Sequence, residues 1–247
     1  MSAPLLEARG VTKAFGGLQA LDAVDLQVGH GEIVGLIGPN GSGKSTLLNC
    51  LGRALPVDAG AILLEGADIT TVAPYRTARL GLTRTFQEIR IFHELPVWEN
   101  ALLGRQWGDV RLSRLVRRSD RATGERARDL LDLVGLTPLR DDYAGNLSGG
   151  QRRLLELVMA MMPRPRLVML DEATSGVNPT LIEHLRRYLL VLHDEEQVSY
   201  LMVEHNTGFI FGMAERIVVL HQGREMANGT PEQIRDDPEV IDAYLGA

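Results

Sequence analysis

Cysteine is almost absent from this 247-residue chain, in which Cys50 is the only one. One thiol cannot form a disulfide within the chain, so a disulfide-stapled secreted scaffold is excluded and a reducing compartment is expected. Cys50 falls in an apolar stretch that reads as a buried helix. We interpret it as a small core residue rather than a reactive thiol.

Long apolar runs and an excess of basic residues are also missing. No stretch of about 18 uncharged apolar residues occurs, so the sequence predicts no membrane-spanning helix. The N-terminal residues lack a basic segment followed by an apolar run, so we expect no signal peptide.

With 26 Lys and Arg against 32 Asp and Glu, the formal net charge is −6. Duplex-binding proteins usually carry a basic footprint, so we expect a soluble, cytoplasmic protein with no nucleic acid partner.

The composition that is present, 45% hydrophobic and 23% charged, is typical of a globular domain. Residues 1–30 contain short, partly alternating segments that predict antiparallel strands, and residues 61–69 read as another edge strand. The continuous apolar runs at 32–38 and 166–170 predict strands buried on both faces. Residues 74–163 read as a mostly helical insertion. Strands that alternate with helices elsewhere predict a mostly parallel, helix-covered sheet.

Several helix ends carry local signals. A helix is predicted from Thr180, where Glu183 three residues later indicates a capping box and the apolar residues share one face. Thr230 is a predicted N-cap, followed by proline at the first helical position and glutamine at the third. Gly135 is the predicted end of a preceding helical segment. The arginine-rich run at 111–128 is interpreted as a solvated helix, with lipid headgroups as the alternative contact.

A glycine-rich loop carries the most specific chemistry. Residues 38–46, GPNGSGKST, match the phosphate-binding pattern between a predicted strand and a predicted helix. Successive backbone N–H groups of such a loop wrap phosphate oxygens, and the helix N-terminus adds partial positive charge. Lys44 would reach the β and γ phosphates of ATP, and Ser45 would hold Mg²⁺. The predicted ATP-binding residues are Gly38, Pro39, Asn40, Gly41, Ser42, Gly43, Lys44, Ser45 and Thr46.

Three polar residues follow predicted buried strands. Asp171 ends the apolar run LVMLD and is predicted to reach the Mg²⁺ shell. Glu172 comes next and is placed to polarise an attacking water, a role that contributes about 10²–10⁴-fold in rate. His205 follows the apolar run YLMV, and ligands of open α/β sheets bind at the carboxyl ends of strands. We therefore predict that His205 contacts the γ-phosphate, whereas chemistry alone assigns no role to Gln87.

A second glycine pair completes a pattern. LSGGQ, residues 147–151, directly precedes a predicted helix and lies upstream of LVMLDEA, residues 167–173. Together with the phosphate loop and His205, these motifs resemble those of ABC-type ATPases over nearly the whole chain.

The resemblance implies an α/β fold. We expect a P-loop NTPase core with a mostly parallel sheet, an N-terminal antiparallel β subdomain and an inserted helical subdomain. The expected division is a single ABC ATPase domain over residues 1–247, with a nucleotide-binding core at 1–87 and 164–247 and a helical signature subdomain at 88–163.

In this family the LSGGQ element completes the site of a facing subunit. The resemblance therefore implies an ATP-sandwich dimer in which a hydroxyl, backbone N–H groups and a helix N-terminus approach the γ-phosphate in trans. The residues implied for this role are Ser148, Gly149, Gly150 and Gln151. A simple helix cap would explain Ser148 but does not require two glycines.

The resemblance also assigns the remaining roles. Phe15 matches the aromatic residue that stacks on adenine, and residues 175–179 match a loop that crosses the dimer interface. Asn178 stands where many relatives have aspartate, and Ala173 where many have proline. The implied catalytic residues are Glu172, His205, Gln87 and Lys44, and the implied Mg²⁺ ligands are Ser45, Gln87 and Asp171.

A closer likeness points to a transporter. FGGLQALD at 15–22, the segment after Gln87, the arginine-rich insertion and the terminal YLG are similar to ATPase subunits of branched-chain amino acid importers, whose relatives also serve urea, amides and aromatic acids. The likeness implies two transmembrane permease subunits, a second ATPase chain and, indirectly, a periplasmic solute-binding protein. It places the chain at the cytoplasmic face of the inner membrane. Residues 88–104 would line the groove for the permease, although Phe92, Leu95 and Trp98 could equally be core.

Three other functions remain as alternatives. The lipopolysaccharide-exporter ATPases are the nearest competing branch, and the insertion and the C-terminal sequence disfavour them. Soluble ABC ATPases of chromosomes, repair or translation carry coiled-coil arms or two ATPase units, which this chain lacks. A small-molecule kinase would share the phosphate loop but would not explain LSGGQ.

Overall fold

The computed structural model of the protein describes residues 3–85, 90–105 and 121–245. Near the N-terminus, four strands form a sheet in the order β2-β1-β4-β5, in which all neighbours are antiparallel. The antiparallel strands predicted there are confirmed. Their bounds are β1 Leu6–Phe15, β2 Leu18–Val28, β4 Ala59–Leu64 and β5 Ala67–Asp68.

The prediction of one edge strand over residues 61–69 was wrong. Glu65 and Gly66 have positive φ angles of 51° and 78°, and they turn the chain into a tight hairpin between β4 and β5. Because β4 also pairs with β1, it lies inside the sheet, and of the two hairpin strands only β5 lies at an edge, opposite β2.

The second sheet has the order β10-β9-β3-β8-β7-β6. The pairs from β9 to β6 are parallel, whereas β10 joins the edge antiparallel to β9. The mostly parallel sheet predicted from the sequence is confirmed. Its strands are β3 Ile33–Ile37, β6 Leu82–Arg84, β7 Leu167–Asp171, β8 Ser199–Val203, β9 Arg216–His221 and β10 Arg224–Gly229.

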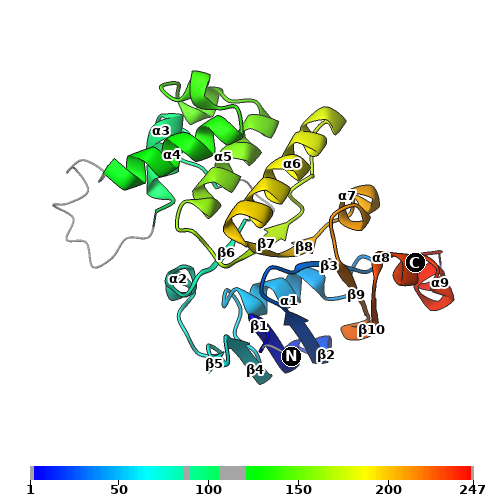
Figure 1. Ribbon diagram of the computed structural model, residues 1–247. Helices are drawn as coiled ribbons and strands as arrows, with labels where there is room; N and C mark the ends of the chain where they lie inside the picture. Colours follow the sequence, from blue (N-terminus) through cyan, green and yellow to red (C-terminus); the bar gives the residue numbers. More distant parts are fainter. Residues whose placement is uncertain (1–2, 86–89, 106–120, 246–247) are drawn as a thin grey trace.

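Helices cover both faces of this second sheet (Figure 1). Helix α1 lies between the two sheets, while α3, α4, α5 and α6 gather on the opposite side. None of the helices in the described ranges is long and apolar enough to span a bilayer. The helices are α1 Lys44–Leu51, α2 Pro74–Thr77, α3 Val97–Leu103, α4 Arg121–Leu133, α5 Gly149–Met161, α6 Pro179–Glu196, α7 Thr207–Phe211, α8 Pro231–Arg235 and α9 Pro238–Leu245, with 3-10 turns at Ala78–Leu80, Thr137–Leu139 and Ala144–Asn146.

The central strands are buried on both faces, as the continuous apolar runs predicted. In β3, Val34 and Leu36 pack with α1, whereas Ile33 and Ile37 belong to the core on the other face. The same alternation continues in β7 and β8. Cys50 of α1 is fully buried between the sheets, so its interpretation as a core residue is confirmed, and burial raises the pKa of its thiol.

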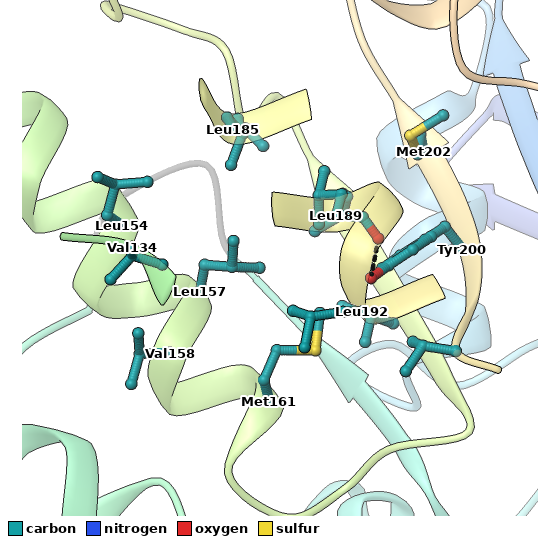
Figure 2. Close-up of a cluster of buried hydrophobic side chains, with 14 of the residues drawn as sticks. Val134, Leu154, Leu157, Val158, Met161, Leu185, Leu189, Leu192, Tyr200 and Met202 are labelled. Atoms are coloured by element: carbon teal, nitrogen blue, oxygen red, sulfur yellow. Dashed lines mark hydrogen bonds between the residues drawn. The ribbon is translucent and has the colours of Figure 1, made fainter. Parts of the chain in front are cut away.

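Helices α5 and α6 pack against β8 through a layer of apolar side chains (Figure 2). The layer includes Leu157 and Met161 from α5 and Leu189 from α6. Tyr200 of β8 is fully buried there, and its hydroxyl donates a hydrogen bond to the carbonyl of Leu189 at 3.1 Å. Burial raises the pKa of Tyr200, so the phenol stays protonated and its only polar atom is satisfied.

The predicted start of α6 at Thr180 was wrong. The N-cap is Asn178, whose side chain accepts a hydrogen bond from the Leu181 amide at 2.9 Å, and Pro179 takes the first helical position. Glu183 makes no capping box, because its carboxylate pairs with Arg186 one turn later. The cap and proline of α8 and the helix end near Gly135 are confirmed.

Candidate functional site

The strand register brings three loops of the candidate site together. Val203 at the end of β8 lies beside Leu36 of β3 on one side and Asp171 of β7 on the other. The carboxyl ends of three neighbouring parallel strands therefore lie at one edge of the sheet. The phosphate loop follows β3, Glu172 follows β7, and His205 follows β8, so the loops that the sequence singled out separately meet at this edge.

The phosphate loop has a backbone that only glycine allows at two positions. Gly38 has a φ of 150°, and a Cβ atom there would lie 2.1 Å from the carbonyl oxygen of Leu220. Gly43 has a φ of 105°, and its Cβ would lie 2.7 Å from the carbonyl oxygen of Ala20. The loop is thus clamped against two strands while its N–H groups stay uncovered by side chains.

The N-terminus of α1 fits an anionic ligand. No side chain of the described residues caps this helix, so its first N–H groups keep their hydrogen-bonding capacity. The hydroxyl of Ser42 is buried and has no partner among the described residues. A phosphate group would satisfy both, so the geometry of the loop fits the phosphate-binding role that its motif predicts.

Lys44 lies folded against the loop. Its ammonium donates to the carbonyls of Gly38 at 2.8 Å and Pro39 at 3.0 Å, and the residue is 6% exposed. Burial lowers the pKa of Lys44, and the nearby charge of Glu172 partly opposes this shift. Ser45 is exposed and Thr46 half-buried beside it, as a metal-binding hydroxyl requires.

Glu172 and His205 form a pair across the site. His205 Nε2 lies 3.1 Å from Glu172 Oε1. Glu172 has a φ of 49°, a left-handed conformation that costs a non-glycine residue on the order of 1–3 kcal/mol and that clusters at functional sites. Its amide donates to the carbonyl of Val203 at 2.8 Å, and its carbonyl accepts from Arg153 Nη2 at 3.3 Å. These bonds hold the strained residue in place.

A buried carboxylate behind this pair was not foreseen. Glu204 is 5% exposed and accepts from the Thr174 amide at 3.0 Å and the Thr174 hydroxyl at 2.5 Å. Burial raises the pKa of Glu204, although the Thr174 hydrogen bonds oppose the shift. The interaction joins the loop after Glu172 to the residue before His205. No local sequence signal indicates it, because the partners are 30 residues apart.

Asp171 is almost buried, at 4% exposed, and has a cationic partner that the sequence did not reveal. Arg84 Nη2 donates to Asp171 Oδ2 at 2.7 Å. Carboxylate and hydroxyl oxygens such as those of Asp171 and Ser45 are the donors that Mg²⁺ prefers. In the described ranges no group of three or more His, Cys, Asp or Glu residues could hold a metal ion by itself. Mg²⁺ usually takes its remaining ligands from water and substrate phosphates, which this donor set allows.

The structure describes one of the two remaining predicted residues, Phe15, but not the other, Gln87. Phe15 ends β1 and is 46% exposed, so its ring is accessible to a planar ligand, although the Lys13 ammonium lies over one face, 5.6 Å from the ring centre. Gln87 lies outside the described residues. The same holds for residues 111–120 of the arginine-rich segment.

The LSGGQ element lies at the start of α5, with Leu147 buried and with Ser148 and Gly149 exposed. Ser148 is the N-cap of a complete capping box with Gln151. A Cβ at Gly150 would lie 2.1 Å from the Cδ2 methyl of Leu181 in α6, so a side chain there would require only the end of Leu181 to move. Gly149 has neither a positive φ nor any atom within 4 Å of an added Cβ. Within the described residues, no hydrogen bond or ion pair joins this element to the phosphate loop of the same chain.

A cavity of about 460 Å³ opens between the core and the helical side. It is lined from the core by residues of β6 and the segment around α2, and from the helical side by α5. Beside it, Asn100 is fully buried and its amide donates to the carbonyls of Phe92, Leu95 and Pro96. Phe92 is 55% exposed, as a groove residue would be, whereas Trp98 packs partly into the core. The two interpretations of this segment, groove lining and core, therefore apply to different residues.

Comparisons with known proteins agree with this geometry. The family described as ABC transporter matches residues 21–175, and the branched-chain amino acid ATP-binding cassette transporter family matches residues 224–247. The chain is 42% identical to the high-affinity branched-chain amino acid transport ATP-binding protein BraF of Pseudomonas aeruginosa, over 100% of this chain and 99% of the relative. It is 38% identical to LivG of Escherichia coli, with the same coverage.

A solved structure has the same fold. The crystal structure of the ADP conformation of an ATP-binding cassette of an ABC transporter superposes with a TM-score of 0.87, at 32% identity and 100% coverage of both chains. The predicted fold class is confirmed. The chain therefore belongs to the ABC transporter family of ATPases, in the branched-chain amino acid subgroup.

Proposed function

We propose that this ATPase energises a membrane transporter that takes up amino acids of the branched-chain type. The observation that carries the proposal is the meeting of Lys44, Asp171 and the Glu172–His205 pair at one sheet edge, beside a loop shaped for phosphate. The names of the full-length relatives support amino acid uptake over a lipopolysaccharide exporter. Urea, amides and aromatic acids are the related solutes to test next.

The residues divide the chemistry of hydrolysis between them. The loop residues 38–46 bind the phosphates of ATP, Phe15 stacks on adenine, and Lys44 turns from its carbonyl partners to the β and γ phosphates. Glu172 accepts a proton from the attacking water, whose oxygen bonds to the γ-phosphorus while the bond to the bridging oxygen breaks, releasing ADP and phosphate. His205 orients Glu172 and contacts the γ-phosphate. Mg²⁺ held by Ser45, Asp171 and Gln87 would neutralise charge on the phosphate oxygens.

The second half of each site comes from a facing ATPase chain. Gly149 supports this, because no atom of the described residues lies within 4 Å of a Cβ added at that exposed helix start. A facing phosphate that must approach the backbone would require glycine there. Residues 148–151 would therefore act in trans, and the exposed loop 175–179 would lie at the dimer interface. Closing the dimer on ATP would drive the permease, provided that ATP binds the closed form better than the open form.

The membrane partners would dock at the cavity beside α2 and α5. The lining of this cavity is largely apolar. Segment 88–104, which contributes to the lining, also carries the exposed ring of Phe92. We propose two permease subunits, a second ATPase chain of the same or a different kind, and a solute-binding protein that acts on the outer side. The chain would then be peripheral on the cytoplasmic face of the membrane. The working division is a core of 1–87 and 164–247 and a signature subdomain of 88–163.

Dimer closure gives the sharpest test. The Glu172→Gln chain should bind MgATP, lose turnover by about 10²–10⁴-fold and form an ATP-dependent dimer, measured by light scattering. Adding Ser148→Arg should abolish the dimer while leaving ATP affinity of the monomer unchanged by calorimetry.

Arginine at position 148 also removes a helix cap, which alone costs about 1 kcal/mol. Thr230→Arg removes the equivalent capping box of α8 and serves as the matched control, expected to keep the dimer. Loss of ATP binding in the Ser148→Arg monomer would show that the LSGGQ element acts in cis. Near-normal hydrolysis by Glu172→Gln would remove Glu172 as the base.

A further inference from the structure

Arg84 joins three elements of the site through one buried side chain. It ends β6, and its side chain is 10% exposed. Its Nη2 donates to Asp171 Oδ2 at the end of β7, and its Nη1 donates to Asn49 Oδ1 in α1, both at 2.7 Å. The guanidinium therefore ties the carboxylate to the helix that begins at the phosphate loop.

The next residue, Thr85, forms hydrogen bonds to the main chain at the same end of β7. The Thr85 hydroxyl, 1% exposed, accepts from the Asp171 amide at 3.3 Å, and the Thr85 amide donates to the carbonyl of Met169 at 3.0 Å. The main chain of Asp171 is thus fixed independently of Arg84. What Arg84 adds is control of the carboxylate itself, which could otherwise rotate about its side-chain torsions.

The chemistry of the contact favours a role in orientation over one in stability. A buried ion pair gains little net stability, because desolvating both charges offsets their attraction. A planar guanidinium, however, presents several donors in a rigid fork and can hold two acceptors at a fixed separation. Asn49 is the second acceptor, and it fixes the plane of the fork relative to α1.

We propose that Arg84 is a positioning residue for the metal-binding carboxylate, holding Asp171 in the orientation that Mg²⁺ bound at the phosphate loop requires. This inference rests on the proposed role of Asp171 as a ligand of the Mg²⁺ shell. Outer-shell partners of this kind usually contribute about 10–100-fold to metal affinity.

The test must separate the charge of Arg84 from the geometry of its guanidinium, because the two have opposite effects on metal binding by Asp171. Removing the cation would increase the attraction between Asp171 and a metal ion, whereas losing the fork would leave the carboxylate free to rotate. Arg84→Lys keeps the charge but cannot hold Asn49 and Asp171 in the same fixed geometry. Asn49→Ala keeps the ion pair and removes the second anchor of the fork.

The measurement is Mn²⁺ binding to the full chain with a non-hydrolysable ATP analogue, followed by the EPR signal of free Mn²⁺. Arg84→Lys should weaken Mn²⁺ binding by about tenfold, and Asn49→Ala should weaken it less. Nucleotide affinity without metal should stay unchanged for both. Unchanged or tighter Mn²⁺ binding by Arg84→Lys would overturn the inference.

Two further variants make the outcome unambiguous. Arg126→Lys alters another ion pair, with Glu196, whose arginine is equally buried but belongs to α4, and it should leave Mn²⁺ binding unchanged. Asp171→Asn should lose Mn²⁺ binding. If Asp171→Asn binds Mn²⁺ normally, the proposed metal site is wrong; if only Arg84→Lys binds normally, the metal site stands and the positioning role fails.

Discussion

At the scale of single residues, the candidate site depends on hydrogen bonds that cross between neighbouring loops. Glu172 has a left-handed backbone, and Val203 and Arg153 hold it through its amide and carbonyl. Its carboxylate meets His205, while Glu204 and Thr174 join the same two loops one layer deeper. The strain at Glu172 is therefore supported from several sides, as expected where a side chain must be held in one orientation.

Glu204 predicts a pH dependence of stability. Burial raises its pKa above 4.5, so the folded chain holds this proton more tightly than the unfolded chain does. The stability from this proton is present below the unfolded value and is lost as the pH rises through the folded pKa. Glu204→Gln mimics the protonated form and does not titrate.

Urea denaturation at several pH values measures this effect. The free energy of unfolding of the wild-type chain should fall relative to Glu204→Gln as the pH rises from 4.5 upwards. Glu94→Gln, at an exposed position, controls for the loss of one carboxyl group. A constant difference between wild type and Glu204→Gln across this range would contradict the prediction.

At the scale of elements, the helix N-termini differ in whether a side chain caps their first N–H groups. Two starts, at Ser148 and Thr230, have full capping boxes, and Asn178 caps α6 by accepting from the Leu181 amide. The start of α1 has no such side-chain cap. The starts of α5, α6 and α8 are thus capped by side chains, whereas α1, like α2 and α3, has no side-chain cap, and its N–H groups at the phosphate loop can bind a ligand.

The cap of α6 can be tested by substitution. Asn178→Ala removes the acceptor for the Leu181 amide and should lower the free energy of unfolding by about 1 kcal/mol. Asn178→Asp keeps an acceptor and adds a negative charge at the helix N-terminus, so it should retain the stability of the wild type. Urea denaturation at neutral pH measures both, and an Asn178→Ala chain as stable as wild type would show that this cap contributes nothing.

At the scale of the whole molecule, α1 lies between two sheets, and the helical side covers the other face of the second sheet (Figure 1). The cavity between the core and the helical side is lined in part by α5, the helix that starts with the LSGGQ element. Glu156 of that helix lines the cavity and pairs with Arg153, which donates to the carbonyl of Glu172. A continuous set of contacts therefore connects the cavity to the loop that carries Glu172.

Docking of the permease can be tested on the intact chain. Phe92→Glu places a charge on the proposed docking surface and should abolish co-purification with membrane subunits from detergent extracts, while ATP binding by the isolated chain stays normal. Ile241→Glu alters another exposed apolar residue, on α9 at a distant end of the molecule, and should co-purify normally. Equal recovery of membrane subunits with both variants would place the docking surface elsewhere.

The sequence by itself determined the fold class, the ABC family and most strands of both sheets. The exceptions are the hairpin between β4 and β5, and β6, which lies within residues predicted to be mostly helical. The features that the sequence determined depend on local patterns: continuous apolar runs, glycine-rich loops and short motifs at helix starts. The start of α6 was misplaced by two residues, because Asn178 and Thr180 both have capping side chains and only backbone geometry distinguishes them. The roles of the predicted site residues stay predictions, and Gln87 lies outside the described ranges.

Only the tertiary structure decided which side chains surround those residues. Arg84 meets Asp171 across 87 positions of sequence, and Glu204 meets Thr174 across 30. No periodicity records such pairs, because they arise where the register of parallel strands aligns their carboxyl ends. The different demands on Gly149 and Gly150 also emerged only when α6 was in place. Short motifs in the sequence indicate the local chemistry, whereas the orientation of a carboxylate depends on which strands become neighbours.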